Sequence, residues 1–210
     1  DDEIFKNWEG LGYYKRALNL REACIEIINN EGILYSSSNK LIELKGIGEY
    51  TAAAIASIAF NEVIPAIDGN VKRIMSRLLC IDQTKTKSII QIKENLSQNI
   101  SKSRPGDFNQ AMMDLGRTIC TPKSPNCIKC PIKSICKAYI KNKVEYYPIK
   151  NRKTKKIPHY NIGVGIIWNK NKLLITKRKK NQLLGGLWEF PGGKVKNNET
   201  IEACIKREIK

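Results

Sequence analysis

The sequence predicts a mainly α-helical domain followed by a smaller α/β domain. Residues 1–138 contain several runs with apolar side chains at helical spacing. Residues 141–160 then hold two prolines, many cations and no apolar periodicity, a composition typical of a linker. Runs rich in β-forming residues follow. We therefore expect a helical domain at 1–138, a basic linker at 139–159 and a second domain at 160–210.

Helices of the first domain are indicated by periodicity and by end signals. Residues 15–29 place apolar side chains at helical spacing, and a glycine at position 32 ends the run. The alanine-rich run 49–60 predicts a helix that packs closely. Asp107, with Gln110 three positions later, has the spacing of a capping box and predicts a helix start. The predicted helices span residues 15–29, 39–44, 49–60, 69–79 and 87–100, with a further one from residue 107.

The second domain is predicted to start with a β-hairpin. Ile162–Trp168 and Leu173–Thr176 are rich in β-forming residues, and the polar residues 169–172 between them suit a turn. The single histidine, His159, stands in the linker, where we expect a surface residue rather than a ligand or a base.

The charge of the chain favours a polyanionic partner. Its 210 residues include 37 Lys and Arg against 20 Asp and Glu, a net charge of +17 spread along the sequence. A proteome rich in lysine would explain part of this excess, but nucleic acid is the first expectation. No apolar run approaches the roughly 20 residues of a membrane span, and no signal-like start is visible. We expect no membrane association and a cytoplasmic location.

Four of the seven cysteines fall within 17 residues, at the spacing C-x6-C-x2-C-x5-C. In a reducing compartment, one metal centre explains four such thiols more readily than disulfides do. Zinc and a [4Fe-4S] cluster both accept four thiolates, so the spacing leaves the metal open. A scaffolding role is favoured over electron transfer. The expected ligands are Cys120, Cys127, Cys130 and Cys136.

Lysines surround this cysteine loop, where they would offset negative charge or bind phosphates. They are Lys123, Lys129, Lys133 and Lys137. The other cysteines, Cys24, Cys80 and Cys204, lie on apolar helix faces, and we assign them to the core.

The segment Lys45-Gly46-Ile47-Gly48 precedes the alanine-rich helix. Its glycines allow positive φ and leave backbone N–H groups uncovered, and the helix that follows presents the positive end of its dipole. A phosphate oxygen fits such a place. An isolated Gly-x-Gly is more often a tight turn between helices, so the assignment depends on Asp68, twenty residues after Gly48.

Asp68 precedes a predicted helix and is therefore an expected N-cap. A helix N-terminus also favours an ionised carboxylate. Such a carboxylate stabilises a developing sugar cation or orients water, as in glycoside hydrolysis. Beside a phosphate-binding hairpin, Asp68 thus indicates cleavage at a nucleotide's sugar, and no cluster of metal-binding carboxylates in this half indicates cleavage at its phosphate.

The first 138 residues resemble the helix-hairpin-helix DNA glycosylases with an iron–sulfur cluster loop, and within them the MutY type of adenine DNA glycosylase. The resemblance rests on WEGLGYYKRALNL, LKGIGEYTAAAIASIAF, IPAIDGNVKRI, FNQAMMDLGRTIC and the four cysteines. It implies a [4Fe-4S] cluster at residues 120–136 rather than zinc. It also implies that Asp68 is the catalytic aspartate, and that Leu11 and Tyr13 form the wedge that enters the duplex and fills the gap left by an extruded base.

The resemblance separates a hydrolase from a lyase at Tyr50. The related endonuclease III type has a lysine at this position, which forms a Schiff base and gives lyase activity. A phenol forms no imine, so a monofunctional hydrolase is implied, in which water captures the sugar. Lys72, one helical turn after Asp68, is expected to contact a phosphate or to pair with Asp68.

The family's general acid is a glutamate in a segment before the motif WEGLGYY. That segment lies upstream of Asp1, and neither Glu3 nor Glu9 matches it. We expect the chain to be a fragment, cut at both ends, that is nearly inactive by itself.

Residues 185–209 fit the opening of a Nudix box, G-x5-E-x7-R-E-U. In Nudix hydrolases, glutamates on this helix hold Mg²⁺ against a pyrophosphate, so Mg²⁺ is a second expected cofactor. MutY-type proteins carry a Nudix-like domain that reads 8-oxoguanine, and we favour this use over nucleotide hydrolysis. The box residues are Gly193, Glu199, Arg207 and Glu208.

The predicted function is hydrolytic removal of adenine opposite 8-oxoguanine or guanine in double-stranded DNA, in base excision repair, by a monomer. One alternative is an endonuclease III-like glycosylase with lyase activity, which Tyr50 disfavours. Another is a non-catalytic, metal-stapled DNA-binding module, which would leave Asp68 and the Nudix-like stretch without a role.

Overall fold

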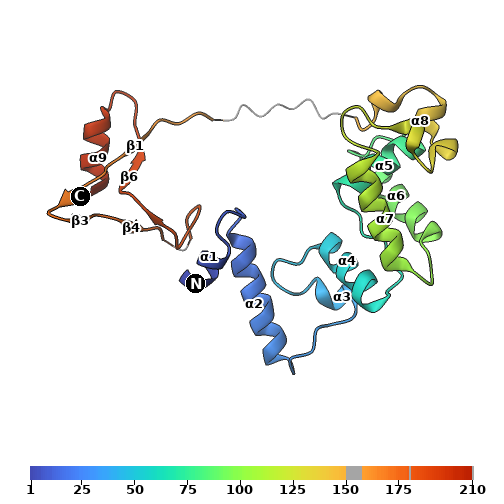
Figure 1. Cartoon of the computed structure of the whole chain (residues 1–210), viewed down its shortest axis with the longest axis horizontal. Helices are drawn as coiled ribbons and strands as arrows, with labels where there is room; N and C mark the ends of the chain where they lie inside the picture. Colours follow the sequence, from blue (N-terminus) through green and yellow to red (C-terminus); the bar gives the residue numbers. More distant parts are fainter. Residues whose placement is uncertain (150–157, 180, 210) are drawn as a thin grey trace. The chain divides into compact units, whose positions relative to one another are not determined.

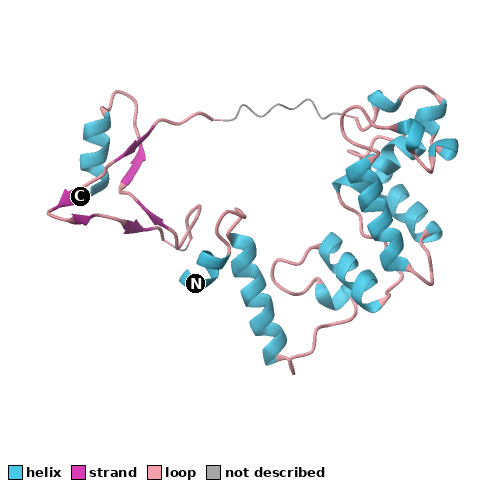
Figure 2. Ribbon diagram, in the orientation of Figure 1, coloured by secondary structure: helices cyan, strands magenta, loops and turns pink. Residues whose placement is uncertain are grey.

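The structure, a computed structural model, describes residues 1–149, 158–179 and 181–209. The chain forms two compact units, one made of Asp1–Arg21 with Lys155–Lys210 and the other of Glu22–Thr154 (Figure 1). Within the described residues, strands occur only from residue 162 onwards (Figure 2). The predicted fold class, mainly α followed by α/β, is confirmed.

The helices of the larger unit lie close to their predicted places. α2 (Lys15–Asn29), which begins in the smaller unit, α4 (Glu49–Phe60) and α5 (Gly69–Leu79) have the predicted ends. The other two, α3 (Ser38–Leu41) and α6 (Thr86–Asn99), differ from prediction by one to three residues at each end.

The predicted capping box at Asp107 is wrong. α7 (Pro105–Thr118) begins two residues earlier, with Arg104 as its N-cap. Proline at the first helical position has its φ already set for a helix, so it starts α7 before Asp107. Asp107 therefore lies in the first turn and pairs with Arg104, and Gln110 donates to the Gly106 carbonyl.

Two apolar clusters form the core of the larger unit. The first joins α2, α3 and α4 around Leu41 and Leu44. The second joins α5, α6 and α7 around Met75 and Ile92. The predicted periodicities thus face one another, as amphipathic helices require.

Two glycines bring α7 close to its neighbours. A Cβ atom at Gly106 would lie 2.8 Å from the Ile58 Cα in α4, and one at Gly116 would lie 2.6 Å from the Asn70 Cβ in α5. Neither position has room for a side chain, so α7 packs tightly against both helices. This packing fixes the start of α5.

Asn109 of α7 fixes the segment that leads into α5. Its buried amide accepts from the Ala66 N–H at 3.0 Å and donates to the Ile64 carbonyl at 2.9 Å and to Ser57 Oγ at 2.8 Å. Every contact is made inside the protein, where an unpaired polar group is costly. The residues just before Asp68 are thereby held in place.

The start of the predicted linker 139–159 is not a free linker. α8 (Lys137–Ile140) and a 3₁₀ turn, η3 (Val144–Tyr146), continue the larger unit beyond two further 3₁₀ turns, η1 (Cys127–Lys129) and η2 (Lys133–Ile135). Arg77 then donates to the Tyr147 carbonyl at 2.9 Å. The remaining part of that linker, residues 150–157, lies outside the described residues.

The strands of the smaller unit pair in twos. β1 (Ile162–Val164) pairs antiparallel with β6 (Gly192–Lys194), and β4 (Thr176–Lys177) with β5 (Trp188–Glu189). β2 (Trp168–Asn169) and β3 (Lys172–Leu173) form the predicted hairpin. The predicted strand 162–168 is divided, because its two ends pair with different partners. α9 (Ile201–Ile209) packs on β1 and β6, where Cys204 is buried as predicted.

Residues 1–21 group with the carboxy-terminal part rather than with the helices, unlike the predicted domain 1–138. Phe5 of α1 (Asp2–Asn7) is buried, with its ring edge-on to Tyr14 and against the Gly186 turn. Lys177 also bonds both oxygens of Asp2, at 2.7 and 3.0 Å, and holds the pKa of that carboxyl below its ordinary value.

Two smaller expectations can be compared with the structure. Cys24 is exposed, so its assignment to the core is wrong, because its side chain faces away from the cluster that Ala23 enters; Cys80 is half-buried at the end of α5. Among the described residues, no helix combines the length and apolarity that crossing a membrane requires.

We predict that Asn109→Ala lowers the free energy of unfolding by about 2–4 kcal/mol, because it strands the buried Ala66 N–H and Ile64 carbonyl. Urea denaturation followed by circular dichroism measures this change. Asn99→Ala, on the exposed face of α6, is the matched control and should cost less than about 0.5 kcal/mol. Equal effects of both substitutions would contradict the role of Asn109.

Candidate functional site

Asp68 caps α5, as predicted. Its Oδ1 accepts from the Val71 N–H at 2.7 Å, and its Oδ2 accepts from Asn70 Nδ2 at 2.8 Å. The carboxylate is half-buried, so one side remains open to a ligand. Two donors and the helix dipole thus orient and stabilise a negative charge here.

Asn70 links Asp68 to Arg73. Its Oδ1 accepts from Arg73 Nη2 at 2.9 Å, while the same guanidinium donates to the Gly116 carbonyl at 2.7 Å and to the Cys120 carbonyl at 2.8 Å. Arg73 is buried, and burial lowers the pKa of its guanidinium. A continuous row of hydrogen bonds therefore runs from Asp68 to the first cysteine of the loop.

Arg77, one helical turn further along α5, holds the same loop. Its guanidinium donates to the Cys120 Sγ at 3.2 Å and to the Thr121 carbonyl at 2.9 Å. Arg77 is only 2% exposed. α5 thus carries Asp68 at its start and two buried arginines that bind the cysteine loop.

The four predicted cysteines come together. All of them line one small, largely apolar cavity, together with Arg77 and Ile74. Burial raises the pKa of the Cys127 thiol, and Cys120, Cys136 and Cys130 raise it further; burial likewise raises the pKa of Cys130. Such thiols need a bound cation to become thiolates.

The spacing of the four thiols bears on the kind of metal group that this loop could hold. A tetrahedral zinc holds its sulfurs roughly 3.8 Å apart, as Zn–S bonds of about 2.3 Å require. Among the described residues, no group of three or more Cys, His, Asp or Glu side chains is close enough to hold one metal ion. In a [4Fe-4S] cluster each cysteine binds a different iron, so the thiolates stand further apart.

The glycine hairpin has the geometry that a phosphate needs. Gly46 has φ +84°, and Gly48 caps α4 without any side chain bonding the first turn. Among the described residues, no atom lies within 4 Å of a Cβ placed on Gly48. The N-terminus of α4 is therefore open to close approach by an anion.

Tyr50 and Lys72 both follow the glycine hairpin in the sequence. Tyr50 is 39% exposed, donates to Met113 Sδ at 3.5 Å and borders a cavity shared with Ile67, the residue before Asp68. Lys72 forms no ion pair with Asp68 among the described residues, where Asn70 and the Val71 N–H donate to the two carboxylate oxygens. Of the two expected roles of Lys72, the phosphate contact stays a prediction.

Leu11 and Tyr13 belong to the other compact unit. They are 60% and 82% exposed, on a turn in which Gly10 and Gly12 have φ values of +82° and +63°. Both side chains are therefore accessible at the surface of this turn.

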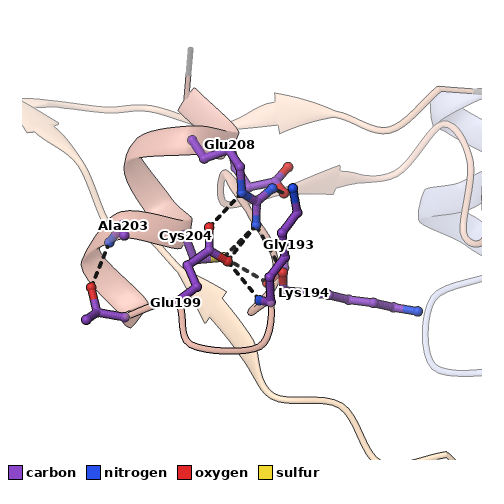
Figure 3. Close-up of polar contacts among 9 residues, drawn as sticks. Gly193, Lys194, Glu199, Ala203, Cys204 and Glu208 are labelled. Carbon is purple, nitrogen blue, oxygen red and sulfur yellow. Dashed lines mark hydrogen bonds and ion pairs between the residues drawn. The ribbon is translucent and has the colours of Figure 1, made fainter.

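The Nudix-box residues form an ion-pair clamp between α9 and the loop before it (Figure 3). Arg207 donates to both oxygens of Glu199, at 2.7 and 2.9 Å, and also pairs with Glu208. The Arg207 guanidinium, with the Lys196 N–H, lowers the pKa of Glu199 to about 2. A side chain at Gly193 would collide with Glu208. Both carboxylates are thus engaged, and the four residues serve the structure of this loop.

Sequence reasoning missed Asn70, Arg73 and Arg77. A weak sequence signal for them is present. All three are polar side chains of α5, and the two arginines occupy buried positions on the helix face that also carries apolar side chains. The carbonyl groups that bind Arg73 and Arg77 lie more than 40 residues away, so no local pattern identifies these contacts.

Comparisons with known proteins agree with this geometry. Residues 1–102 match the model described as HhH-GPD superfamily base excision DNA repair protein, and residues 163–210 match the NUDIX domain model. The adenine DNA glycosylase of Arabidopsis thaliana is 36% identical over 98% of this chain and 35% of its own length. The adenine DNA glycosylase of Buchnera aphidicola subsp. Acyrthosiphon pisum is 39% identical over 99% of this chain and 59% of its own length. The chain thus spans less than two thirds of these relatives.

Solved structures of similar fold come from two related enzymes. A thermostable thymine-DNA glycosylase has a TM-score of 0.61 and 28% identity, over 67% of this chain and 66% of that one. A non-covalent endonuclease III–DNA complex has a TM-score of 0.58 and 26% identity over the same shares.

We predict that Glu199→Gln changes the acid sensitivity of the smaller unit. The ordinary pKa of this carboxyl is 4.5 and the folded value is about 2, so the clamp is fully stabilising above pH 4.5 and is lost as the pH falls towards 2. In wild-type protein the unfolding free energy should therefore decline as the pH falls from 5 to 2, and in Glu199→Gln this decline should be smaller. Urea denaturation at each pH measures it. Exposed Glu202, changed to Gln, is the control; wild-type pH dependence in Glu199→Gln would contradict the clamp.

Proposed function

We propose that the chain is a member of the HhH-GPD superfamily of base excision DNA repair proteins and that it hydrolyses the bond between adenine and deoxyribose in duplex DNA. The observation that supports this most is the Asp68 carboxylate, fixed by two donors at the N-terminus of α5. The choice of adenine as the base that is removed follows from the relatives named adenine DNA glycosylase.

In this reaction Asp68 would stabilise positive charge on the sugar. As adenine leaves with the electron pair of the glycosidic bond and takes up a proton, positive charge develops on the sugar. A fixed carboxylate stabilises that charge until water adds and releases a proton. Because Asn70 and the Val71 N–H already orient both oxygens, little reorganisation is needed. Tyr50 offers no amine for a Schiff base, which favours a hydrolase over a lyase.

Several features of the two units would serve DNA binding. The uncapped N-terminus of α4 behind Gly46 and Gly48 would bind a phosphate, and Lys72 would bind another. Leu11 and Tyr13 would enter the duplex and fill the gap that the extruded adenine leaves in the base stack. The net charge of +17 favours the duplex as partner.

The cysteine loop would hold a [4Fe-4S] cluster through its four thiolates, as structural support for the lysine-bearing loop that follows α7. The common cavity that the four cysteines line supports this assignment. Such a cluster supplies charge and cross-linking rather than a reaction step.

The Nudix-like part would recognise 8-oxoguanine or guanine opposite the adenine. The clamp supports recognition rather than nucleotide hydrolysis, because Arg207 already engages Glu199 and Glu208 and leaves few free carboxylate oxygens for Mg²⁺. Mg²⁺-dependent release of pyrophosphate from 8-oxo-dGTP by the protein as the cell makes it would favour the hydrolase instead.

We predict that Asp68→Asn removes the preference for a cationic sugar. Duplexes carry either a cationic pyrrolidine or a neutral tetrahydrofuran in place of the target deoxyadenosine, opposite 8-oxoguanine. Because the pyrrolidine mimics the developing charge, wild-type protein should bind it at least tenfold more tightly, and Asp68→Asn should bind both duplexes alike. Fluorescence anisotropy measures both affinities.

Asp82→Asn controls for the loss of one carboxylate, since Asp82 lies in an exposed turn with Thr84. It should keep the preference. Full preference in Asp68→Asn would contradict the catalytic role of Asp68. In the protein as the cell makes it, single-turnover adenine release should fall by about 10³-fold in Asp68→Asn, without abasic-site cleavage in either protein.

We predict about four iron and four acid-labile sulfide atoms per chain after anaerobic purification. Cys127→Ser should lose most of the iron, whereas Cys24→Ser, at an exposed cysteine outside the loop, should keep it. One zinc per chain and no sulfide would contradict the cluster and would favour a zinc-stapled binding module.

A further inference from the structure

Arg16 lies between the two aromatic side chains that flank the exposed turn of residues 9–13. Its Cζ is 5.6 Å from the centre of the Trp8 ring and 5.5 Å from that of the Tyr13 ring. At such distances a guanidinium is attracted to both ring faces. The three side chains therefore form a stack with the cation in the middle.

Hydrogen bonds close the turn around this stack. Trp8 Nε1 donates to the Gly12 carbonyl at 3.0 Å, and Arg16 Nη2 reaches the Leu11 carbonyl at 3.4 Å. The Arg16 N–H donates to the Tyr13 carbonyl at 2.8 Å. Both ends of the turn are thus tied to Arg16 and Trp8.

The turn needs this support. Tyr13 has φ +46°, in the left-handed region that residues with a side chain rarely adopt, and it is 82% exposed. An aromatic side chain held in such a conformation, while most of its surface faces solvent, gains little from its own burial. Strain of this kind persists where neighbouring contacts impose it, and it often marks a functional site.

We infer that Arg16 is a positioning residue for the wedge: its guanidinium, stacked between Trp8 and Tyr13, holds Tyr13 in the conformation in which it enters the duplex. This inference rests on the proposed function, since it takes Tyr13 as the side chain that fills the gap left by the flipped adenine. Arg16 itself touches no reacting atom. It reduces the ordering that Tyr13 would otherwise undergo on binding.

The test uses a duplex with 2-aminopurine beside the target adenine opposite 8-oxoguanine. The fluorescence of 2-aminopurine rises when the wedge unstacks it, and a role confined to folding would leave this signal unchanged at saturating protein. Arg16→Met should lower the unstacking equilibrium by about 3- to 10-fold, as the loss of two exposed cation–π contacts implies. Arg16→Lys should give an intermediate value, because an ammonium keeps the charge without the planar stacking surface.

Arg21→Met is the matched control. It removes one positive charge from the same helix, at an exposed arginine that lies 3.9 Å from Asp1 and away from the turn. Duplex affinity should fall in both variants and further in Arg16→Met, while unstacking at saturating protein should fall only in Arg16→Met. If Arg16→Met does not fold, the comparison of Arg16→Lys with Arg21→Lys replaces it.

Tyr13→Ala separates the wedge role of Tyr13 from the positioning role of Arg16. Loss of the fluorescence rise in Tyr13→Ala, together with its retention in Arg16→Met, would overturn the positioning role and leave the wedge in place. An undiminished rise in Tyr13→Ala would overturn the wedge and, with it, the role of Arg16. Loss in both, with Arg21→Met unaffected, supports the inference.

Discussion

The hydrogen bonds of Arg73 are the constraint on which the rest of the site depends. One buried guanidinium bonds Asn70, which orients Asp68, and also bonds the carbonyls of Gly116 and Cys120. A buried charge is tolerated only where such partners are all present. The start of α5, the end of α7 and the first cysteine therefore have to fold together, and Arg77 adds a second bond to the same loop.

This arrangement explains why the carboxylate and the cysteine loop occur in one unit although they are far apart in the sequence. Gly116 lets α7 approach Asn70, and Asn109 holds the segment before Asp68. If the cysteines bind a cluster, its contribution to the reaction is then positional: it keeps the carbonyl partners of Arg73 in place. The cysteine loop and the proposed catalytic carboxylate are in this way parts of one packed structure.

Periodicity and end signals predicted the helices well, because each depends on neighbours within a few residues. Asp68 was predicted for the same reason, since an N-cap is a local feature. The partners Arg73 and Asn109 were not, because contacts across more than 40 residues leave no local signal. The start of α7 was misplaced where Pro105 outweighed a capping-box spacing, and the grouping of residues 1–21 depends on Phe5 and Asp2 meeting residues far along the chain.

The hydrogen bonds of Arg73 are tested most directly by the preference of Arg73→Met for a duplex with cationic pyrrolidine over one with neutral tetrahydrofuran. Arg117→Met, which changes an exposed arginine of α7, is the control. We expect Arg73→Met to remain folded by circular dichroism, to bind the neutral duplex normally and to lose most of the preference, as Asn70→Ala should. Arg117→Met should keep it. Full preference in a folded Arg73→Met protein would contradict the claim that α5 and the cysteine loop together orient Asp68.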